Sequence, residues 1–119
     1  MAAPHRLERD VQYEIRTGLG LREDIVLWRN SSGLATHEGT GRKQRFGLVP
    51  GAADLIGIHT VDGVGLFFAL ETKSSRGTLS NNQRLFCNLV RTRGGIFVSA
   101  RSLEAVEQGL VEERRRILG

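Results

Sequence analysis

Cysteine is almost absent from this 119-residue chain, and long apolar runs are missing from it altogether. The single Cys87 excludes an internal disulfide framework and is typical of a reducing compartment. No apolar run approaches the roughly 18 residues of a membrane-spanning helix. The N-terminal stretch MAAPHRLERD is too charged for a secretory signal. We therefore expect a cytoplasmic protein.

Common ligand-binding patterns are missing as well. The three histidines, His5, His37 and His59, do not have the spacing of zinc ligands. The glycine-rich stretch 39–43 lacks the spacing, and the following Ser or Thr, of a nucleotide-binding P-loop. Cys87 lies at helical spacing with apolar residues and has no recognisable histidine partner, which indicates core packing. The sequence thus argues against a zinc site, a P-loop and a thiol nucleophile.

Composition and charge set the remaining bounds. A hydrophobic content of 39% and a charged content of 25% are ordinary for a soluble globular protein, and the length predicts one domain spanning 1–119. The net charge of +4 and the pI near 10.2 favour a polyanionic partner. On charge alone, an ordinary mildly basic protein without such a partner is an equally good interpretation.

The most informative stretch is Pro50 to Lys73, where Asp62-Gly63 separates two apolar runs. Asp-Gly in this setting predicts a tight hairpin turn, and a two-residue loop places Asp54 opposite Glu71. Facing carboxylates repel each other, so a divalent cation with hard oxygen ligands is a natural neighbour. Lys73 lies on the same face as Glu71 because side chains alternate along a strand. A structural salt bridge between Lys73 and one carboxylate is the alternative interpretation.

The rest of the chain predicts an α/β fold with a mixed β-sheet flanked by helices, in the order α-β-β-β-α-β-α. The expected elements are a helix over about 6–19, a strand over 25–28, the hairpin strands around 55–58 and 66–70, a helix capped by Ser80, a strand over 96–99 and a helix capped by Ser102. Because both hairpin faces are apolar, we expect the hairpin to lie centrally or to be covered on each side. Leu85 and Leu89 are expected to widen the apolar stripe of the second helix, and 112–116 to form a solvated helix end.

Three further features have two interpretations each. Glu8 begins the first helix, where a dipole interaction with full solvent exposure is the usual explanation for an acidic residue. Gln83 lies in the first turn of a buried helix face, so it either points at the hairpin carboxylates or DNA or hydrogen-bonds the neighbouring loop. The long polar connection 33–50 carries Arg42, Lys43 and Arg45 beside an aromatic residue, a combination that suits phosphates and unstacked bases. A mobile loop without a ligand explains the same segment.

Asp54 followed by Glu71-Thr72-Lys73 resembles the D…(E/D)xK signature of the PD-(D/E)xK nuclease superfamily. More narrowly, the chain resembles the VRR-NUC (virus-type replication-repair nuclease) family of bacteriophages. The other similar motifs are Glu8-x-x-Val11-Gln12, Arg29-Asn30-x-x-Gly33, Gly47 to Asp54, Ser80-x-x-Gln83 and Gly94-Gly95. ExK alone is a weak motif, whereas the ordered set is specific. Ala53 stands where a proline often precedes the aspartate, at a position that supplies only backbone geometry.

The resemblance implies a restriction-endonuclease-like core and a Mg²⁺- or Mn²⁺-dependent endodeoxyribonuclease. By that resemblance Asp54, Glu71 and the Thr72 backbone carbonyl ligate the metal. Glu8 completes the acidic site, and Lys73 and Gln83 join Asp54, Glu71 and Glu8 as catalytic residues. We add Arg42, Lys43 and Arg45, together with Arg29, as expected DNA-binding residues.

The resemblance further implies a substrate and an assembly. Viral members of the family act on branched DNA, so we expect a homodimer that cuts Holliday junctions or flaps during phage replication or repair, in a bacterium or a phage-infected host cell. A nonspecific or restriction-type endonuclease with the same catalytic residues is one alternative. A non-catalytic DNA-binding module, with a purely structural acidic cluster, is an alternative of another class.

Overall fold

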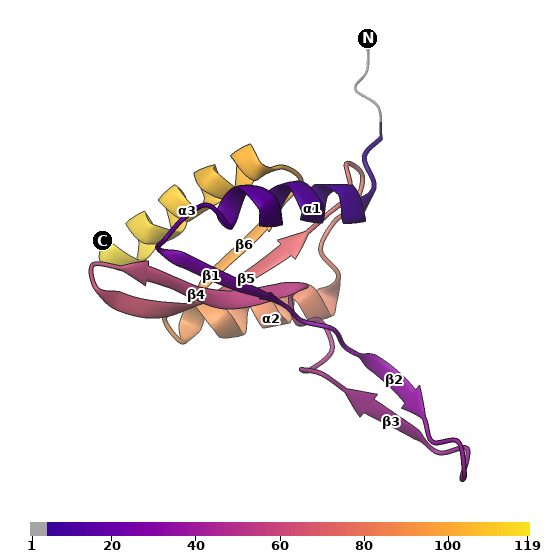
Figure 1. The fold of residues 1–119 in the computed structure, drawn as a ribbon. Helices are drawn as coiled ribbons and strands as arrows, with labels where there is room; N and C mark the ends of the chain where they lie inside the picture. The colour runs from indigo at the N-terminus through magenta and orange to yellow at the C-terminus, as the bar shows by residue number, and fades with distance from the viewer. Residues whose placement is uncertain (1–4) are drawn as a thin grey trace.

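The computed structural model describes residues 5–119 and is mixed α/β (Figure 1). Residues 1–4, part of the stretch judged too charged for a secretory signal, lie outside the described residues. The elements follow one another as α1 (Glu8–Leu19), β1 (Ile25–Arg29), β2 (Gly33–Thr36), β3 (Lys43–Phe46), β4 (Leu55–Val61), β5 (Val64–Thr72), α2 (Asn81–Thr92), β6 (Ile96–Ala100) and α3 (Leu103–Leu118). Within this described range, no helix is long and apolar enough to cross a membrane.

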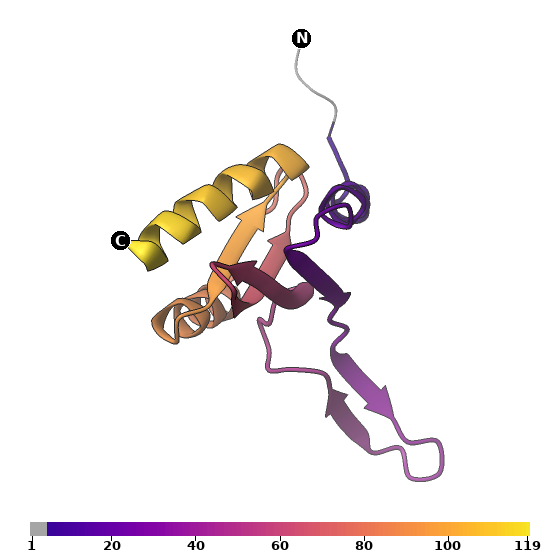
Figure 2. The same ribbon diagram turned by 60° about the vertical axis from the view of Figure 1, so that its left-hand side comes forward.

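A four-stranded sheet in the order β1-β4-β5-β6 forms the centre of the molecule. β1, β4 and β5 pair antiparallel, whereas β6 runs parallel to β5 after the crossover through α2. α1 and α3 cover one face of this sheet and α2 covers the other (Figure 2). The predicted mixed sheet flanked by helices is therefore confirmed, as is the central position of the β4–β5 hairpin.

The β4–β5 hairpin has the predicted register. Ile56 pairs with Ala69 and Ile58 with Phe67, so the two loop residues are Asp62 and Gly63. Both have positive φ angles, 50° and 79°, as a two-residue type I′ turn requires. This register brings the residue before β4, Asp54, to the level of Glu71 near the end of β5.

α2 and α3 begin where capping residues predict. Ser80 accepts a hydrogen bond from the Gln83 N–H, and the Gln83 side chain binds the Ser80 N–H in return, a complete capping box. Ser102 caps α3 through the Ala105 N–H. The expectation for Leu85 and Leu89 is wrong, because they are 66% and 49% exposed. α2 buries only the narrower stripe of Phe86, Cys87 and Val90.

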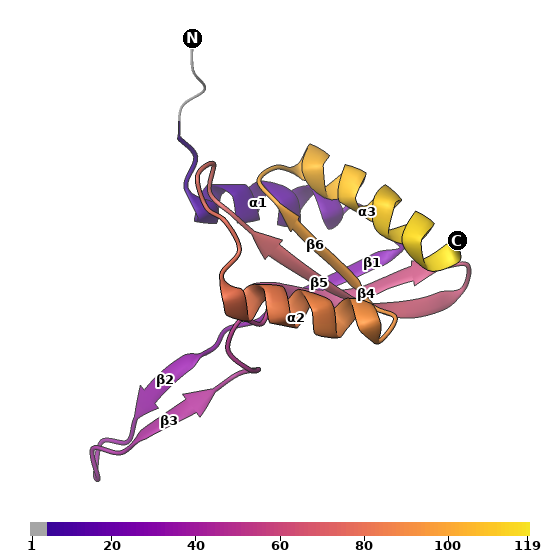
Figure 3. The ribbon, with the colours of Figure 1, turned by 180° about the vertical axis from the view of Figure 1, so that it is seen from behind.

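The segment 33–50 is not the continuous loop that the sequence predicted. β2 and β3 pair antiparallel, from Gly33 with Phe46 to Thr36 with Lys43, and form a separate two-stranded sheet. The predicted order α-β-β-β-α-β-α therefore omits two strands. They went unrecognised because both strands are almost entirely exposed and carry no apolar alternation. This β2–β3 arm, residues 33–46, projects away from the sheet and its helices (Figure 3).

One further expectation about exposure needs correction. Glu113, in the predicted solvated helix end 112–116, is only 4% exposed. It lies buried because Arg91, Arg116 and the Phe97 N–H donate to it from three elements.

The β4–β5 hairpin is central in the sheet, one of its two predicted positions, but α2 leaves part of one sheet face open. The open residues form what we call the apolar sheet patch: Val26, Trp28, Ile58 and Phe67, which are 41% to 53% exposed.

Candidate metal centre

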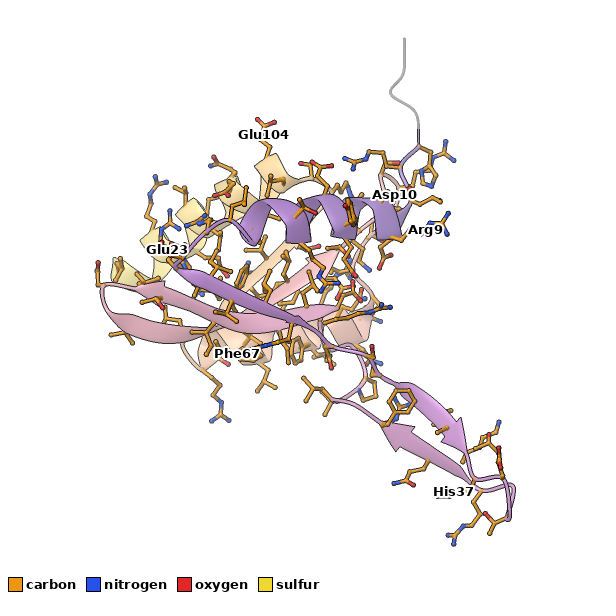
Figure 4. All side chains as sticks on the ribbon, viewed as in Figure 1. Arg9, Asp10, Glu23, His37, Phe67 and Glu104 are labelled. Carbon is orange, nitrogen blue, oxygen red and sulfur yellow. The ribbon has the colours of Figure 1, made fainter. Side chains whose placement is uncertain are left out.

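Several elements begin or end at one end of the central sheet (Figure 1). β1, β5 and β6 end there, and α1, β4 and α2 begin there, so side chains far apart in the sequence meet. The β2–β3 arm leaves the molecule at the same end, because it lies between β1 and β4 in the chain. Figure 4 marks the place by Arg9 and Asp10 in the first turn of α1.

Three carboxylates form the acidic cluster at this end: Glu8, Asp54 and Glu71. One oxygen of each lies within 4.8 Å of the others. Glu8 is exposed at the start of α1, Asp54 is partly buried before β4, and Glu71 is buried at the end of β5. Like charges so close are destabilising unless something compensates them. The cluster therefore depends on its neighbours.

Backbone and hydroxyl contacts hold Asp54 in place. The Thr72 hydroxyl donates to Asp54 Oδ2 at 3.1 Å, and the Asp54 N–H donates to Glu71 Oε2 at 3.3 Å. The Asn30 N–H donates to the Asp54 carbonyl at 2.7 Å, which ties the exit of β1 to the entry of β4. Gln12 Nε2 reaches the same Thr72 hydroxyl at 3.4 Å. The Asp54 carboxylate is thus positioned by two strands and by α1.

Glu71 and Lys73 are joined through Gln83. Lys73 Nζ lies 3.6 Å from Glu71 Oε1 and donates to Gln83 Oε1 at 2.9 Å. The Gln83 amide donates in turn to Glu71 Oε1 at 3.1 Å. The same Gln83 side chain completes the capping box of α2. The start of that helix therefore fixes the position of the Glu71 carboxylate relative to the Lys73 ammonium. Gln83 therefore points at Glu71 and also hydrogen-bonds the neighbouring Ser80, whereas its catalytic role stays a prediction.

Electrostatics distinguish Glu71 from an ordinary surface glutamate. Burial, and then the nearby Asp54 carboxylate, raise the pKa of Glu71 to about 8. Lys73 lowers the same pKa but does not offset these two effects. Burial and Asp54 also raise the pKa of Glu8. The single ammonium is therefore insufficient for three carboxylates, and the interpretation of a self-contained salt bridge does not account for the whole cluster.

The predicted DNA-binding residues divide into two places. Arg29, at the end of β1, lines a pocket of about 430 Å³ together with Gln12 and with Glu8 and Asp54 of the acidic cluster. Arg42, Lys43 and Arg45 lie on the β2–β3 arm and contact none of these carboxylates among the described residues. Metal ligation by the Thr72 backbone carbonyl stays a prediction.

Sequence reasoning missed three supporting side chains. Gln12 and Asn30 occur in the quoted motifs but were given no role, and for Thr72 only the backbone was considered. Gln12 follows Glu8 by one helical turn on the same side of α1, which was a usable signal. The Thr72 hydroxyl faces Asp54 only because the strand ends there, and the sequence pattern gave no sign of that contact.

Comparison with known proteins adds no relative. The chain matches no family model, no curated protein and no solved structure. The family resemblance therefore stays a prediction that depends on the motifs and on the geometry of the acidic cluster.

Proposed function

We propose that this chain is a metal-dependent DNA endonuclease with a restriction-endonuclease-like core, of the VRR-NUC type. One observation carries the proposal: oxygens of Glu8, Asp54 and Glu71 lie within 4.8 Å of one another, with Lys73 Nζ 3.6 Å from Glu71. Three carboxylates and one ammonium around a single point are the groups that hydrolysis of a phosphodiester needs.

The chemistry of the donors fits Mg²⁺ or Mn²⁺. All three side chains offer hard carboxylate oxygens, and the cluster has no sulfur or imidazole ligand to favour zinc. Burial, and then the nearby Asp54 carboxylate, raise the pKa of Glu71, and a bound divalent cation would stabilise the charged form of this carboxylate. When bound, the cation would polarise the scissile phosphate and lower the pKa of a water nucleophile. Asp54, Glu71 and Glu8 would hold it.

Lys73 and its partners complete the proposed chemistry. The Lys73 ammonium orients the attacking water and donates to a phosphate oxygen, where negative charge develops. Gln83 keeps Nζ beside Glu71 through its two hydrogen bonds. The Thr72 hydroxyl fixes the Asp54 carboxylate. Each group is thus held by a partner outside the reaction.

For the substrate we propose branched DNA, cut by a homodimer. Paired cuts in a four-way junction need two identical sites, which a C₂ dimer presents. The apolar sheet patch supports a second copy as partner, because Val26, Ile58 and Phe67 are neighbours across three strands and stay exposed. Sedimentation of the wild type and of Trp28→Ser tests this assembly: the variant should sediment as a monomer. A monomeric wild type contradicts the dimer.

The decisive experiment is cleavage of a labelled four-way junction, a flap and a matched duplex in Mg²⁺, Mn²⁺ and EDTA. Asp54→Asn and Lys73→Ala are the test variants, and Glu112→Gln, an exposed glutamate of α3, is the control. We expect metal-dependent cleavage of branched DNA by the wild type and the control, and none by the test variants. Cleavage unaffected by Asp54→Asn contradicts the proposed site.

The same experiment separates the alternatives. Equal cleavage of duplex and junction would favour a nonspecific or restriction-type endonuclease. Tight DNA binding without cleavage in either metal, with no effect of metal on stability, would favour a non-catalytic DNA-binding module. The close approach of Glu8, Asp54 and Glu71, with Lys73 beside Glu71, favours the nuclease over that module.

A further inference from the structure

A groove runs between α1 and the edge strand β1, and it extends from the side of the acidic cluster towards the end of α1. This α1–β1 groove has a volume of about 610 Å³. Its polar lining comes from Arg9, Gln12, Tyr13 and Arg16 on α1 and from Arg29 on β1, and its apolar lining includes Leu19, Ile25 and Leu27. The α1 residues share one side of the helix because they recur every three or four positions.

The groove is continuous with the candidate metal centre. Arg9, Gln12 and Arg29 line both the groove and the pocket that contains Glu8 and Asp54. Arg16 lies eight residues beyond Glu8, which is about 12 Å along a helix. At the duplex spacing of about 3.4 Å per nucleotide, that length corresponds to roughly three nucleotides, and an unstacked strand would span it with fewer. A strand whose phosphate reaches the acidic cluster can therefore continue into the groove.

Charge in the groove has one sign. Arg9, Arg16 and Arg29 are exposed, and none of them forms an ion pair with a carboxylate in residues 5–119. The neighbouring Glu14 of α1 is engaged with Arg6 on another side of the helix. Unpaired guanidinium groups in a row are suited to successive phosphates, to which they donate charge-assisted hydrogen bonds.

Tyr13 gives the groove a second kind of contact. Its side chain is 75% exposed in the middle of the arginine row, although an aromatic residue gains most when it is buried. An exposed ring beside phosphate-binding groups can stack on a base, which requires that the base be unpaired. In a duplex the bases are stacked on each other, so this contact selects single-stranded DNA.

We propose that the α1–β1 groove binds an unpaired segment of DNA strand next to the scissile phosphate, with Arg9 and Arg16 on its phosphates and Tyr13 stacked on a base. The proposal rests on the proposed nuclease function and names the feature of the substrate that the site recognises. It assigns to α1 the recognition of a strand that has left the duplex, as at a flap or a branch point.

Binding without cleavage tests this groove. Fluorescence anisotropy with a labelled 12-nucleotide single strand, and with the matched duplex, is measured in EDTA over a range of salt concentrations. We compare the wild type with Arg9→Gln/Arg16→Gln, Tyr13→Ala and Tyr13→Phe. The control is Arg93→Gln/Arg115→Gln, which removes the same charge from exposed positions at the C-cap of α2 and on α3. All these side chains are exposed, so thermal denaturation should show unchanged folding.

The arginine pair should weaken single-strand binding at least tenfold, and should lower the slope of log affinity against log salt by about 1.4, for two phosphate contacts. Tyr13→Ala should weaken single-strand binding about tenfold and leave duplex binding unchanged, and Tyr13→Phe should restore it. An equal loss in the control pair, or an equal effect of Tyr13→Ala on duplex, overturns the proposal.

The result of the binding measurement can be interpreted separately from the result of the cleavage assay. If the groove variants behave as expected but the wild type cleaves no DNA in any metal, the nuclease proposal fails and the groove stands as a single-strand binding site. If cleavage depends on Asp54 but the groove variants bind and cleave as the wild type does, the groove proposal fails and the nuclease stands.

Discussion

Glu71 and Glu113 are both buried glutamates, with 1% and 4% of their surfaces exposed, yet their surroundings have opposite effects. Burial alone would raise the pKa of Glu113, but hydrogen bonds from Arg116, the Phe97 N–H and Arg91 outweigh it and lower that pKa. Burial raises the pKa of Glu71 to about 8, and the Asp54 carboxylate adds to the effect. Within residues 5–119, Lys73 is the only cation that forms an ion pair with Glu71, at 3.6 Å.

The comparison shows that charged neighbours decide whether the effect of burial on the pKa of a glutamate is outweighed. Glu113 has donors on both oxygens and joins α2, β6 and α3. Glu71 shares its surroundings with two other carboxylates and lacks the positive charge that would balance them. A bound cation would stabilise the ionised form of such a buried carboxylate, whereas a carboxylate already paired with arginines gains little from one.

The largest effect that we predict comes from Glu113. Glu113→Gln should lower the free energy of unfolding by about 3 kcal/mol, because Arg91 and Arg116 lose the carboxylate that they share. Urea denaturation measures this change, and Glu112→Gln, on the exposed side of α3, should stay within about 0.5 kcal/mol of the wild type. A loss below about 1 kcal/mol for Glu113→Gln would contradict the structural role given to Glu113.

Bound metal should stabilise the folded protein, and this effect should depend on Glu71 but not on Glu113. At a Mn²⁺ concentration of 100 times Kd, the wild type should gain about 2.7 kcal/mol in free energy of unfolding. The gain should disappear in Glu71→Gln and persist in Glu113→Gln, which is less stable but keeps the acidic cluster. Thermal denaturation with and without EDTA measures it. A gain that survives in Glu71→Gln would place the ion elsewhere.

The pH dependence of stability should follow Glu71 in EDTA. Because its pKa is raised from 4.5 to about 8, the native state keeps a proton that the unfolded chain has lost, and stability falls as pH rises through this interval. Glu71→Gln should lack this fall. At pH 8 its free energy of unfolding should exceed that of the wild type by at least about 1 kcal/mol, since each pKa unit corresponds to about 1.4 kcal/mol. The contribution of Glu113 has the opposite sign and is lost as pH falls below 4.5. Urea denaturation at several pH values decides between these outcomes.

The smallest effect separates the two roles of Gln83. Gln83→Ala and Ser80→Ala each break the capping box and should each cost about 1 kcal/mol of stability. Only Gln83→Ala also removes the contacts to Glu71 and Lys73, so it alone should slow cleavage. Parallel cleavage assays and urea denaturation compare the pair. Equal cleavage by both variants would limit Gln83 to its capping role.

Local signals predicted the elements that hold the site. Asp62-Gly63 set the hairpin register, and with it the approach of Asp54 to Glu71, because turn geometry and side-chain alternation act over a few residues. Ser80 marked the start of α2 for the same reason. The role of Gln83 as a link between Glu71 and Lys73 needed the crossover from β5 into α2, which no local pattern contains.

Contacts between distant segments could not be predicted in this way. Glu113 lies in a charged stretch that is typical of solvated helix ends, and its burial depends on Arg91 and on the backbone of β6. The α1–β1 groove likewise arises only when α1 packs beside the edge strand. Tyr13 and Arg16 gave no signal alone, because an exposed aromatic residue or arginine on a helix is ordinary.

The hydrogen bond from the Asn30 N–H to the Asp54 carbonyl has a consequence for protein engineering. The 2.7 Å between these two atoms ties together, within the body of the protein, the residues that precede and follow the segment that contains the β2–β3 arm. The cost of closing a loop grows only slowly with its length, so the β2–β3 arm, residues 33–46, should tolerate shortening, extension or exchange while Asp54 keeps its position. Gly51 and Ala52 pack against α2 and its surroundings and would have to be kept. The chain thus contains an insertion point directly beside its proposed reaction centre.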